Sequence, residues 1–234
     1  MIICGGDEAG RGAVIGPLVV SLVVAKKEHE RKFAEIGVRD SKLLTRERRE
    51  ALFDRINEIA LEVYIDKISA ADINKAMQSN ISLNELEAVR FSKLFDRVEN
   101  HASILYLDSP DVVASKFGAR VNIYSSKPTK VVGIPADGEK GVRYTKIVSE
   151  HKADAKYPVV SAASIIAKVV RDQEIKDLSK KLGLNVGSGY PSDQTTVDAL
   201  KENVKDEALR RHVREYWGTM DTIRQTRMDS YTEG

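Results

Sequence analysis

Short apolar runs, typical of strands, alternate over most of the chain with longer segments in which apolar residues recur every three to four positions. The short runs predict strands over residues 1–6, 14–24, 63–68, 103–107 and 144–150. The periodic segments predict helices over residues 45–62, from Ser69, and from Ser82 to about residue 100. A long run rich in small residues predicts a further helix over 159–182, which ends at Gly183. Gly, Pro and Lys crowd residues 127–141, which we expect to be irregular or a hairpin. This alternation of strands and helices predicts an α/β fold.

The chain changes character after Tyr190, where only helices are predicted. Ser192 is a suitable N-cap for a helix over residues 193–204, and a basic helix is expected over 206–217. We therefore predict a domain boundary near residue 185. A mixed sheet with helices on both faces would occupy residues 1–185, and a small helical lobe with a tail would occupy 186–234.

Composition restricts the kind of site that the chain can build. A chain of 234 residues with 42% hydrophobic residues is typical of a globular protein with one large domain. Its 37 Lys and Arg nearly balance its 35 Asp and Glu, so the net charge indicates no particular partner. Cys4 is the single cysteine and the His residues do not cluster, which excludes a disulfide framework and a multi-cysteine zinc site. Any metal site must then consist of carboxylates, which suit Mg²⁺ or Mn²⁺.

The sequence contains no recognisable targeting or membrane segment. The N-terminus lacks a basic region before an apolar run, and the longest apolar stretch, residues 13–25, is too short to span a bilayer. We therefore expect a soluble, cytoplasmic protein. No extended apolar face is evident, so we also expect a monomer.

Acidic residues follow three of the predicted strands. Asp7 and Glu8 end the first strand, Asp108 ends the fourth, and Asp154 comes shortly after the fifth. Reactive groups in open α/β sheets gather beyond the strand ends, where several loops converge. Three or four carboxylates in that place would repel one another unless cations neutralised them. The set therefore predicts a site for two divalent metals about 3.5–4 Å apart, the arrangement used for in-line phosphoryl displacement.

Each of these acids also has an ordinary structural interpretation. Asp108 precedes a Ser-Pro pair and could cap the next helix, and Asp154 could be an exposed loop residue. Asp7 and Glu8 are adjacent, so on a regular strand they would point to opposite faces. The surrounding glycines permit a bulge or a positive φ that would bring both to one site. The combination of acids favours the metal site more than any single member does.

The glycine-rich turn after the first strand is a second candidate. Gly10-Arg11-Gly12 lets the backbone approach a ligand closely and offers an arginine for phosphate. In isolation, a tight hairpin turn with an exposed arginine is the simpler explanation. Ser41 and Lys42 precede a helix whose N-terminal amides could hold phosphate, although plain capping is an equal alternative.

Basic residues occur in two of the helical segments. Lys168 and Arg171 lie on one side of the helix over 159–182 and either hold a substrate backbone or are merely solvated. A basic, aromatic segment near the C-terminus suits a duplex backbone, or is a helix anchored by its tryptophan. This segment comprises Arg210, Arg211, His212, Arg214, Tyr216 and Trp217.

These motifs together resemble those of ribonuclease HII, the type 2 ribonucleases H. DEAGRGAVIGPLVV, at residues 7–20, resembles the opening signature of that family. Four more segments match it in order: Asp40-Ser41-Lys42, Leu107-Asp108-Ser109, HKADAKYPVVSAASIIAKVVRD at residues 151–172, and Gly187-Ser188-Gly189-Tyr190-Pro191. The match covers nearly the whole chain, and the spelling of the segment at 151–172 resembles archaeal members.

The resemblance implies a fold and a set of metal ligands. The fold would be ribonuclease H-like, with a five-stranded mixed sheet flanked by helices and a small C-terminal helical lobe. The catalytic, metal-binding acids would be Asp7, Glu8, Asp108 and Asp154. The cofactor would be Mg²⁺ or Mn²⁺.

The resemblance also implies residues that bind the substrate. Gly10, Arg11 and Gly12 would read the ribose 2′-hydroxyl through backbone groups, because a hydroxyl both donates and accepts a hydrogen bond. Tyr190 would stack on the sugar that follows the ribonucleotide. Further contacts to the substrate are expected from Ser41, Lys42, Lys168 and Arg171.

The activity implied is that of an endonuclease that cuts RNA/DNA hybrids and DNA duplexes with embedded ribonucleotides. It would hydrolyse the phosphodiester 5′ to the ribonucleotide with two metal ions. A junction resolvase on the same fold would share the acids and ignore the 2′-hydroxyl. A nucleic-acid-binding module without activity would need the basic patches and not the acids.

The C-terminal tail partly resembles a sliding-clamp-binding pattern. Gln225 is followed three residues later by Met228 and then by Tyr231. Thr232 stands where the pattern has a second aromatic residue. We therefore consider a sliding clamp as a further partner.

Overall fold

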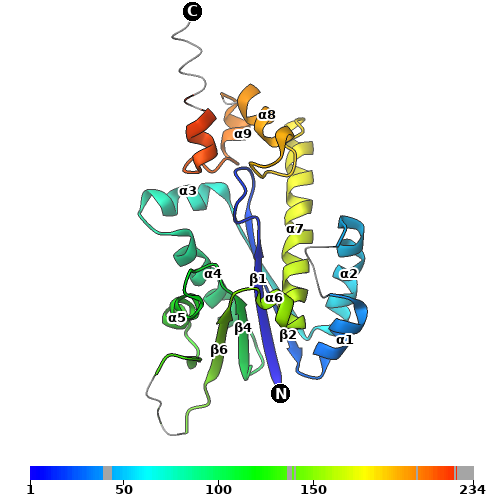
Figure 1. Cartoon of the computed structure of the whole chain (residues 1–234), viewed down its shortest axis with the longest axis vertical. Coiled ribbons are helices and arrows are strands. Elements are labelled where there is room, and N and C mark those ends of the chain that lie inside the picture. Colours follow the sequence, from blue (N-terminus) through cyan, green and yellow to red (C-terminus); the bar gives the residue numbers. More distant parts are fainter. Residues whose placement is uncertain (39–43, 136–138, 140, 204, 224, 226–234) are drawn as a thin grey trace, which may run out of the picture. The chain divides into compact units, whose positions relative to one another are not determined.

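The six strands of the described residues form one mixed sheet in the order β3-β2-β1-β4-β6-β5, of which β1, β2, β4 and β6 are labelled in Figure 1. The computed structural model describes residues 1–38, 44–135, 139, 141–203, 205–223 and 225. Its strands are β1 (Ile2–Ala9), β2 (Leu18–Lys26), β3 (Glu62–Ile68), β4 (Ile104–Asp108), β5 (Thr129–Val131) and β6 (Thr145–Glu150). The predicted α/β class is confirmed. The expected strand number of five is wrong, because the three-residue β5 adds an edge strand in a region expected to be irregular or a hairpin.

Strand direction divides the sheet. β1 pairs antiparallel with β2, whereas β4 runs parallel to both β1 and β6, and β5 runs parallel to β6. The carboxyl ends of β1, β4 and β6 therefore meet at one edge of the sheet. This is the edge at which an α/β fold gathers its reactive groups.

The helices complete the chain between and after these strands. They are α1 (His29–Ile36), α2 (Arg46–Ile59), α3 (Ala70–Gln78), α4 (Leu83–Arg97), α5 (Ala114–Tyr124), α6 (Ala153–Lys156), α7 (Pro158–Leu182), α8 (Gln194–Glu202) and α9 (Glu207–Arg210). The predicted N-cap Ser69 is confirmed, since its hydroxyl accepts a hydrogen bond from the Asp72 N–H. Thr45 caps α2 in the same way, accepting from the Arg48 N–H. No helix in the described part of the chain combines the length and apolarity that a membrane span needs.

Two compact units can be distinguished, and each is described by itself. The sheet unit comprises Met1–Ala9, Val19–Asp66 and Asn84–Val169. The helical unit comprises Gly10–Leu18, Lys67–Leu83 and Val170–Gly234. This division does not follow the boundary predicted near residue 185, because the loop 10–18 and α3 pack with the C-terminal segment.

In the sheet unit, glycines let helices approach both faces of β1. A Cβ added at Gly5 would lie 2.5 Å from the backbone carbon of Val159 in α7. A Cβ added at Gly6 would lie 2.9 Å from the ring of Phe91 in α4. The helices α1 and α2 pack with the first half of α7 on one face, and α4 and α5 cover the other (Figure 1). Because strand residues alternate between faces, Asp7 leaves the sheet on the same face as Gly5.

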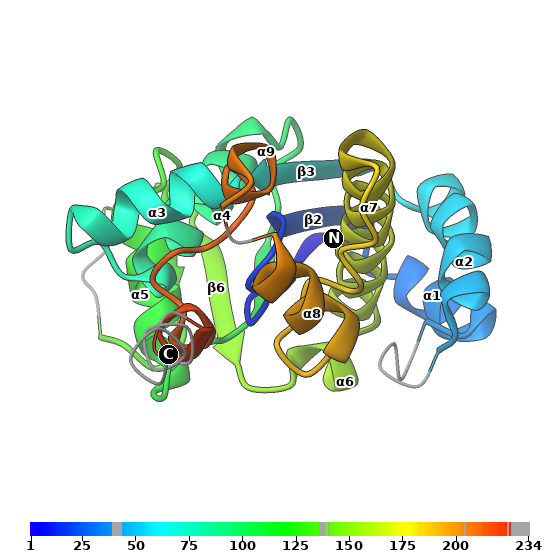
Figure 2. The same ribbon diagram turned by 90° about the horizontal axis from the view of Figure 1, so that it is seen from above.

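In the helical unit, the loop 10–18 is tied to the C-terminal segment. The N–H groups of Val14 and Ile15 both donate to the Gly189 carbonyl, at 2.8 and 3.1 Å. Ile15 also forms a β-bridge with Val213. The blue loop accordingly lies beside the orange segment in Figure 2. A second apolar core, which includes Ile175, Leu200 and Met220, underlies this arrangement.

These ties explain two errors in the sequence prediction. The strand expected from residue 14 begins only at Leu18, since the preceding backbone bonds to Gly189 instead of to β1. The helix expected over 206–217 ends at Arg210, because Val213 and Arg214 direct their backbone groups to the loop 10–18. In both segments tertiary hydrogen bonds override the local pattern.

Smaller differences concern helix ends and missed helices. The cap of α8 is Asp193 and not Ser192, with its carboxylate accepting from the Thr195 N–H at 3.0 Å. The helix α4 ends at Arg97 rather than near residue 100. The helices α1, α5 and α6 were not predicted. The long helix α7 and its end at Gly183 are confirmed, with Gly183 in the left-handed conformation at φ 61°.

Candidate active site

Asp7 and Asp108 lie side by side at the carboxyl ends of two parallel strands. The register pairs Gly6 with Leu107, so the next residue on each strand is one of the two acids. Strand alternation places both side chains on the face that α7 covers. Asp7 is buried, with 5% of its surface exposed.

Burial makes the Asp7 carboxyl unusually hard to ionise. Its pKa is raised to about 6, first by burial and further by the negative charge of Asp108. The positive charge of Lys168 in α7 acts in the opposite direction, as does a hydrogen bond from Ser164. The ammonium of Lys168 also donates to the Ser164 hydroxyl one helical turn earlier. Two carboxylates at this position thus need positive charge beside them.

Asp154 is brought to the same strand end by the short helix α6. Lys152 adopts the left-handed conformation at φ 55°, which turns the chain after β6. The next N–H, that of Ala153, donates to a carboxylate oxygen of Asp108 at 2.7 Å. Asp154 is the following residue and is 7% exposed. The backbone of α6 therefore links two of the predicted acids directly.

Glu8 is less directly placed. Its backbone N–H donates to an Asp7 carboxylate oxygen at 2.8 Å. Pairing with β2 continues regularly through Glu8 and Ala9, so the bulge that the glycines would permit is not observed. The Glu8 side chain consequently leaves the strand on the face opposite to Asp7.

The acids have the chemistry of a hard-cation site without forming a closed cage. Among the described residues, no three Asp, Glu, His or Cys side chains are already arranged to hold one ion. The donor set nevertheless fits divalent metals such as Mg²⁺, because it consists of carboxylate oxygens. One of these carboxyls is the buried Asp7, whose pKa is raised. A bound cation would favour the charged form of Asp7, whose pKa is raised first by burial and then by the charge of Asp108.

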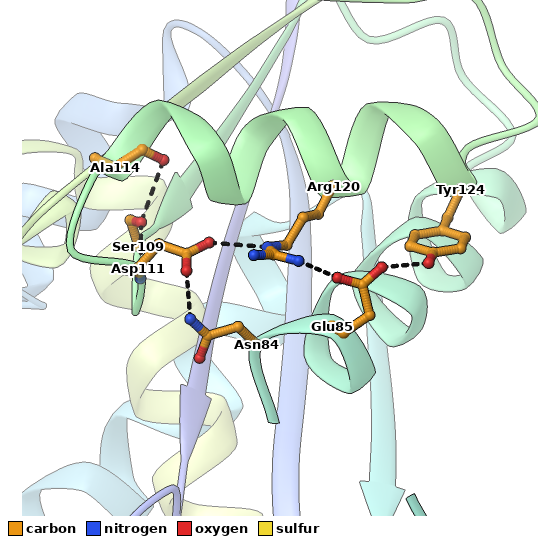
Figure 3. A network of polar contacts seen from close by, with 7 residues as sticks. All are labelled: Asn84, Glu85, Ser109, Asp111, Ala114, Arg120 and Tyr124. Carbon is orange, nitrogen blue, oxygen red and sulfur yellow. Dashed lines mark hydrogen bonds and ion pairs between the residues drawn. The ribbon is translucent and has the colours of Figure 1, made fainter. Parts of the chain in front are cut away.

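A polar network fixes the loop that follows Asp108 (Figure 3). Asp111, 8% exposed, accepts hydrogen bonds from the Asn84 amide and from the Arg120 guanidinium, the latter at 3.2 Å. Arg120 also pairs with Glu85, whose carboxylate accepts from the Tyr124 hydroxyl. The hydrogen bond with Glu85 raises the pKa of Arg120, so the guanidinium stays protonated. Helices α4 and α5 are thereby joined to the segment after β4.

The glycine-rich turn belongs to the helical unit. The Ala13 N–H donates to the Gly10 carbonyl at 3.2 Å, which closes a turn with Arg11 and Gly12 at its centre. Gly10 has φ 89°, and an added Cβ there would lie 2.4 Å from the Arg171 side chain. Gly12 is exposed, has no left-handed φ, and an added Cβ would meet nothing within 4 Å. The fold therefore requires glycine at position 10 and not at position 12.

Arg171 supports the turn and Tyr190 from inside the helical unit. It is 3% exposed, its guanidinium donates to the Ser188 carbonyl at 2.8 Å, and it lies 4.3 Å from the centre of the Tyr190 ring. The half-buried Tyr190 is thus held by stacking on Arg171. Arg171 has little surface left for a phosphate, in contrast to the role expected from the sequence.

Several predicted residues are differently situated. Ser41, Lys42, Met228 and Tyr231 lie outside the described residues. In the basic segment, Arg214 is fully buried and Arg210 forms an ion pair with Glu215 at 3.4 Å. Only part of that segment can therefore meet a nucleic acid.

The structure emphasises two groups that sequence reasoning did not single out. Ser164 contacts Asp7 and Lys168, and its position four residues before Lys168 is the signal that could have revealed this. The network around Asp111 joins residues far apart in the chain, so no local pattern predicts it.

Comparison with known proteins decides the family. The family model described as ribonuclease HII matches residues 4–220. The chain belongs to the ribonuclease HII family. A ribonuclease HII of Pyrococcus furiosus is 41% identical, with 97% of this chain and 92% of that protein covered. Members of this family are endonucleases that hydrolyse nucleic acid, and the chain is accordingly an enzyme of the ribonuclease H class.

Solved structures agree with this assignment. The crystal structure of the ribonuclease H2 from Pyrococcus horikoshii matches with a TM-score of 0.80 and 38% identity, covering 97% of this chain and 98% of that one. The ribonuclease HII in the PCNA complex from Archaeoglobus fulgidus matches with a TM-score of 0.76 and 36% identity, covering 93% and 95% of the two chains. The expected ribonuclease H-like fold is confirmed.

The network around Asp111 generates a stability prediction. Asp111→Ala removes the acceptor shared by Asn84 and Arg120, so the free energy of unfolding should fall by about 1–3 kcal/mol. Turnover should fall as well, because the loop after Asp108 loses its support. Urea unfolding and cleavage assays measure both effects. Lys116→Ala, an exposed change on α5, is the matched control, and equal stability of the two variants would contradict the supporting role.

Proposed function

We propose that this ribonuclease HII hydrolyses the phosphodiester 5′ to a ribonucleotide, both in RNA/DNA hybrids and in DNA duplexes with embedded ribonucleotides. The observation that carries the proposal is the buried Asp7 with the partly buried Asp108 beside it, since the parallel register sets the two side by side. Asp154 adjoins them through the hydrogen bond from Ala153. Membership of the family supports the same reaction class.

The four acids Asp7, Glu8, Asp108 and Asp154 would hold two divalent cations, Mg²⁺ or Mn²⁺. When bound, such cations supply activation of a water molecule and neutralisation of charge on the phosphate. Asp7 and Asp108 offer oxygens from neighbouring strands, and the Ala153 N–H fixes the rotation of the Asp108 carboxylate. Lys168, oriented by Ser164, keeps positive charge near Asp7 before any cation binds. Because Glu8 leaves β1 on the face opposite to Asp7, its side chain would have to turn around the end of the strand to reach these cations.

The helical unit would select the ribonucleotide. Gly12 is exposed and the fold alone does not require glycine there, so its missing side chain is best explained by a ligand that approaches the backbone closely. The backbone groups of Gly10-Arg11-Gly12 would read the 2′-hydroxyl. Tyr190 would stack on the next sugar, with Arg171 positioning its ring from behind. Ser41 and Lys42 would add phosphate contacts.

Two alternatives differ in what they require. A junction resolvase would need the acids but no reader of the 2′-hydroxyl, and the open backbone at Gly12 argues against it. A binding module without activity would have no use for two neighbouring carboxylates at a strand end, of which Asp7 is buried.

A sliding clamp is a second proposed partner. The ribonuclease HII of Archaeoglobus fulgidus was solved as a complex with PCNA and is 36% identical to this chain over most of its length. We propose that Gln225, Met228 and Tyr231 form the corresponding contact in the C-terminal tail.

Asp108→Asn tests the proposed reaction. The variant should lose several orders of magnitude in turnover because a neutral amide is a poor ligand for Mg²⁺ or Mn²⁺. It should stay folded, since the amide oxygen can still accept from Ala153. Gel assays with a duplex carrying one ribonucleotide, an all-DNA duplex and a four-way junction separate the alternatives.

The exposed Asp177→Asn on α7 is the matched control. The proposal predicts cleavage of the ribonucleotide duplex alone, 5′ to the ribonucleotide. An active Asp108→Asn protein, or equal cleavage of the junction, would contradict it.

Gly12→Ala and Gly10→Ala separate binding from folding. Gly12→Ala should change the free energy of unfolding by no more than about 0.5 kcal/mol, since nothing lies near the added methyl group. It should nevertheless reduce kcat/KM on the ribonucleotide duplex by obstructing the ribose. Gly10→Ala should destabilise the fold by about 1–3 kcal/mol because of its φ and the contact with Arg171. Normal cleavage by Gly12→Ala would refute the close approach.

Removal of the residues after Ile223 tests the clamp contact. The truncated protein should cleave its substrate normally but no longer retain a sliding clamp in a pull-down. Tyr231→Ala should reproduce the loss, and Thr232→Ala serves as the matched control. Unchanged retention by the truncated protein would rule the tail out.

A further inference from the structure

Arg214 is the largest fully buried side chain of the described residues and lies in a segment that looked suited to phosphate. A buried guanidinium is costly unless its N–H groups find acceptors. Here one terminal nitrogen donates to the Arg11 carbonyl at 2.9 Å. The other terminal nitrogen and Nε donate to the Gly16 carbonyl, each at 3.2 Å. Arg214 therefore directs these N–H groups to backbone carbonyls of the loop 10–18.

The position of Arg214 is itself fixed within the helical unit. Its backbone N–H donates to the Val14 carbonyl at 2.9 Å, and its guanidinium lies 5.0 Å from the centre of the Trp217 ring. The Gly16 N–H in turn donates to the His212 carbonyl at 2.9 Å. The guanidinium is thus a rigid donor under the glycine-rich turn.

The hydrogen bond from Arg214 to the Arg11 carbonyl fixes the orientation of the Arg11–Gly12 peptide, which the Ala13–Gly10 hydrogen bond alone does not determine. The hydrogen bond from Ala13 to Gly10 closes a β-turn of either type I or type II. The two types differ in the orientation of the central peptide, here that between Arg11 and Gly12. Glycine at the third position favours type II, which requires a positive φ there. Gly12 has no such φ, so the turn is not of type II.

The orientation of this peptide decides which group faces outward. In a trans peptide the C=O and N–H point in opposite directions, and the structure has no cis peptide among the described residues. Because Arg214 draws the Arg11 carbonyl inward, the N–H of the exposed Gly12 points away from it. A flip to type II would present a carbonyl acceptor where the amide donor had been.

We propose that Arg214 is a positioning residue that sets the donor pattern with which the glycine-rich turn recognises a ribose 2′-hydroxyl. The inference rests on the proposed function and adds a determinant of specificity to it. Arg214 acts through the Arg11–Gly12 peptide and does not touch the substrate.

The test compares binding to two duplexes without divalent metal, so that no cleavage occurs. Fluorescence anisotropy gives the affinity for a DNA duplex with one ribonucleotide and for the matched all-DNA duplex. In Arg214→Met the preference for the ribonucleotide should fall about tenfold, as expected for loss of a hydrogen bond to a charged donor. Affinity for the all-DNA duplex should stay unchanged. Arg211→Met removes a charge from an exposed neighbour and should weaken both duplexes equally.

A second measurement reports on the turn itself. With ¹⁵N-glycine labelling, wild-type Gly12 should give one sharp amide signal and couplings of a negative φ. In Arg214→Met that signal should broaden or double, while Gly5 and Gly6 in the sheet unit stay unchanged.

The outcomes distinguish this inference from the function on which it rests. A folded Arg214→Met protein that keeps the full ribonucleotide preference would overturn the inference alone. If Arg214→Met does not fold, the wild-type Gly12 signal decides instead. A single amide signal with couplings of a negative φ supports the inference. Exchange between two turn conformations, or a positive φ at Gly12, overturns it. A wild-type protein that neither prefers nor cleaves the ribonucleotide duplex would overturn the proposed function itself.

Discussion

The burial of the Asp7 carboxyl next to a second carboxylate, Asp108, is the constraint on which the sheet unit depends. Parallel pairing of β1 with β4 leaves Asp7 and Asp108 as neighbours at the same edge. The raised pKa of Asp7 follows first from its burial and then from the negative charge of Asp108. A fold that merely needed stability would place neutral residues at these positions. Retaining the acids makes sense when a positive species joins them during function.

The surroundings of the pair serve this same constraint. Gly5 lets α7 lie against β1, and that helix then brings Ser164 and Lys168 to Asp7. The hydrogen bond from Ala153 and the network around Asp111 fix the segments on either side of Asp108. The helical unit follows a similar principle with two buried arginines, which bond to carbonyls of the glycine-rich segments and so fix their backbones.

Local patterns predicted those parts of the fold that local energetics control. The helix α7 was predicted from its long run of small and apolar residues together with its C-terminal Gly183. The placement of Asp7 and Asp108 at neighbouring strand ends was predicted because apolar strands that end in acids are visible in one sequence. The segments 14–17 and 211–217 were misassigned, since their backbone groups bond to each other and to Gly189 across long stretches of chain. The burial of Arg171 and Arg214 was missed as well, because the local sequence does not distinguish an exposed arginine from one buried under a loop by tertiary contacts.

Direct measurement of Mn²⁺ binding addresses the central claim independently of turnover. Electron paramagnetic resonance of free Mn²⁺ during titration counts the bound ions in the wild type and in the double variant Asp7→Asn, Asp108→Asn. The account predicts saturable binding to the wild type that the double variant loses while its circular dichroism stays native. Equal binding by the two proteins, or none by the wild type in the presence of a substrate duplex, would contradict it.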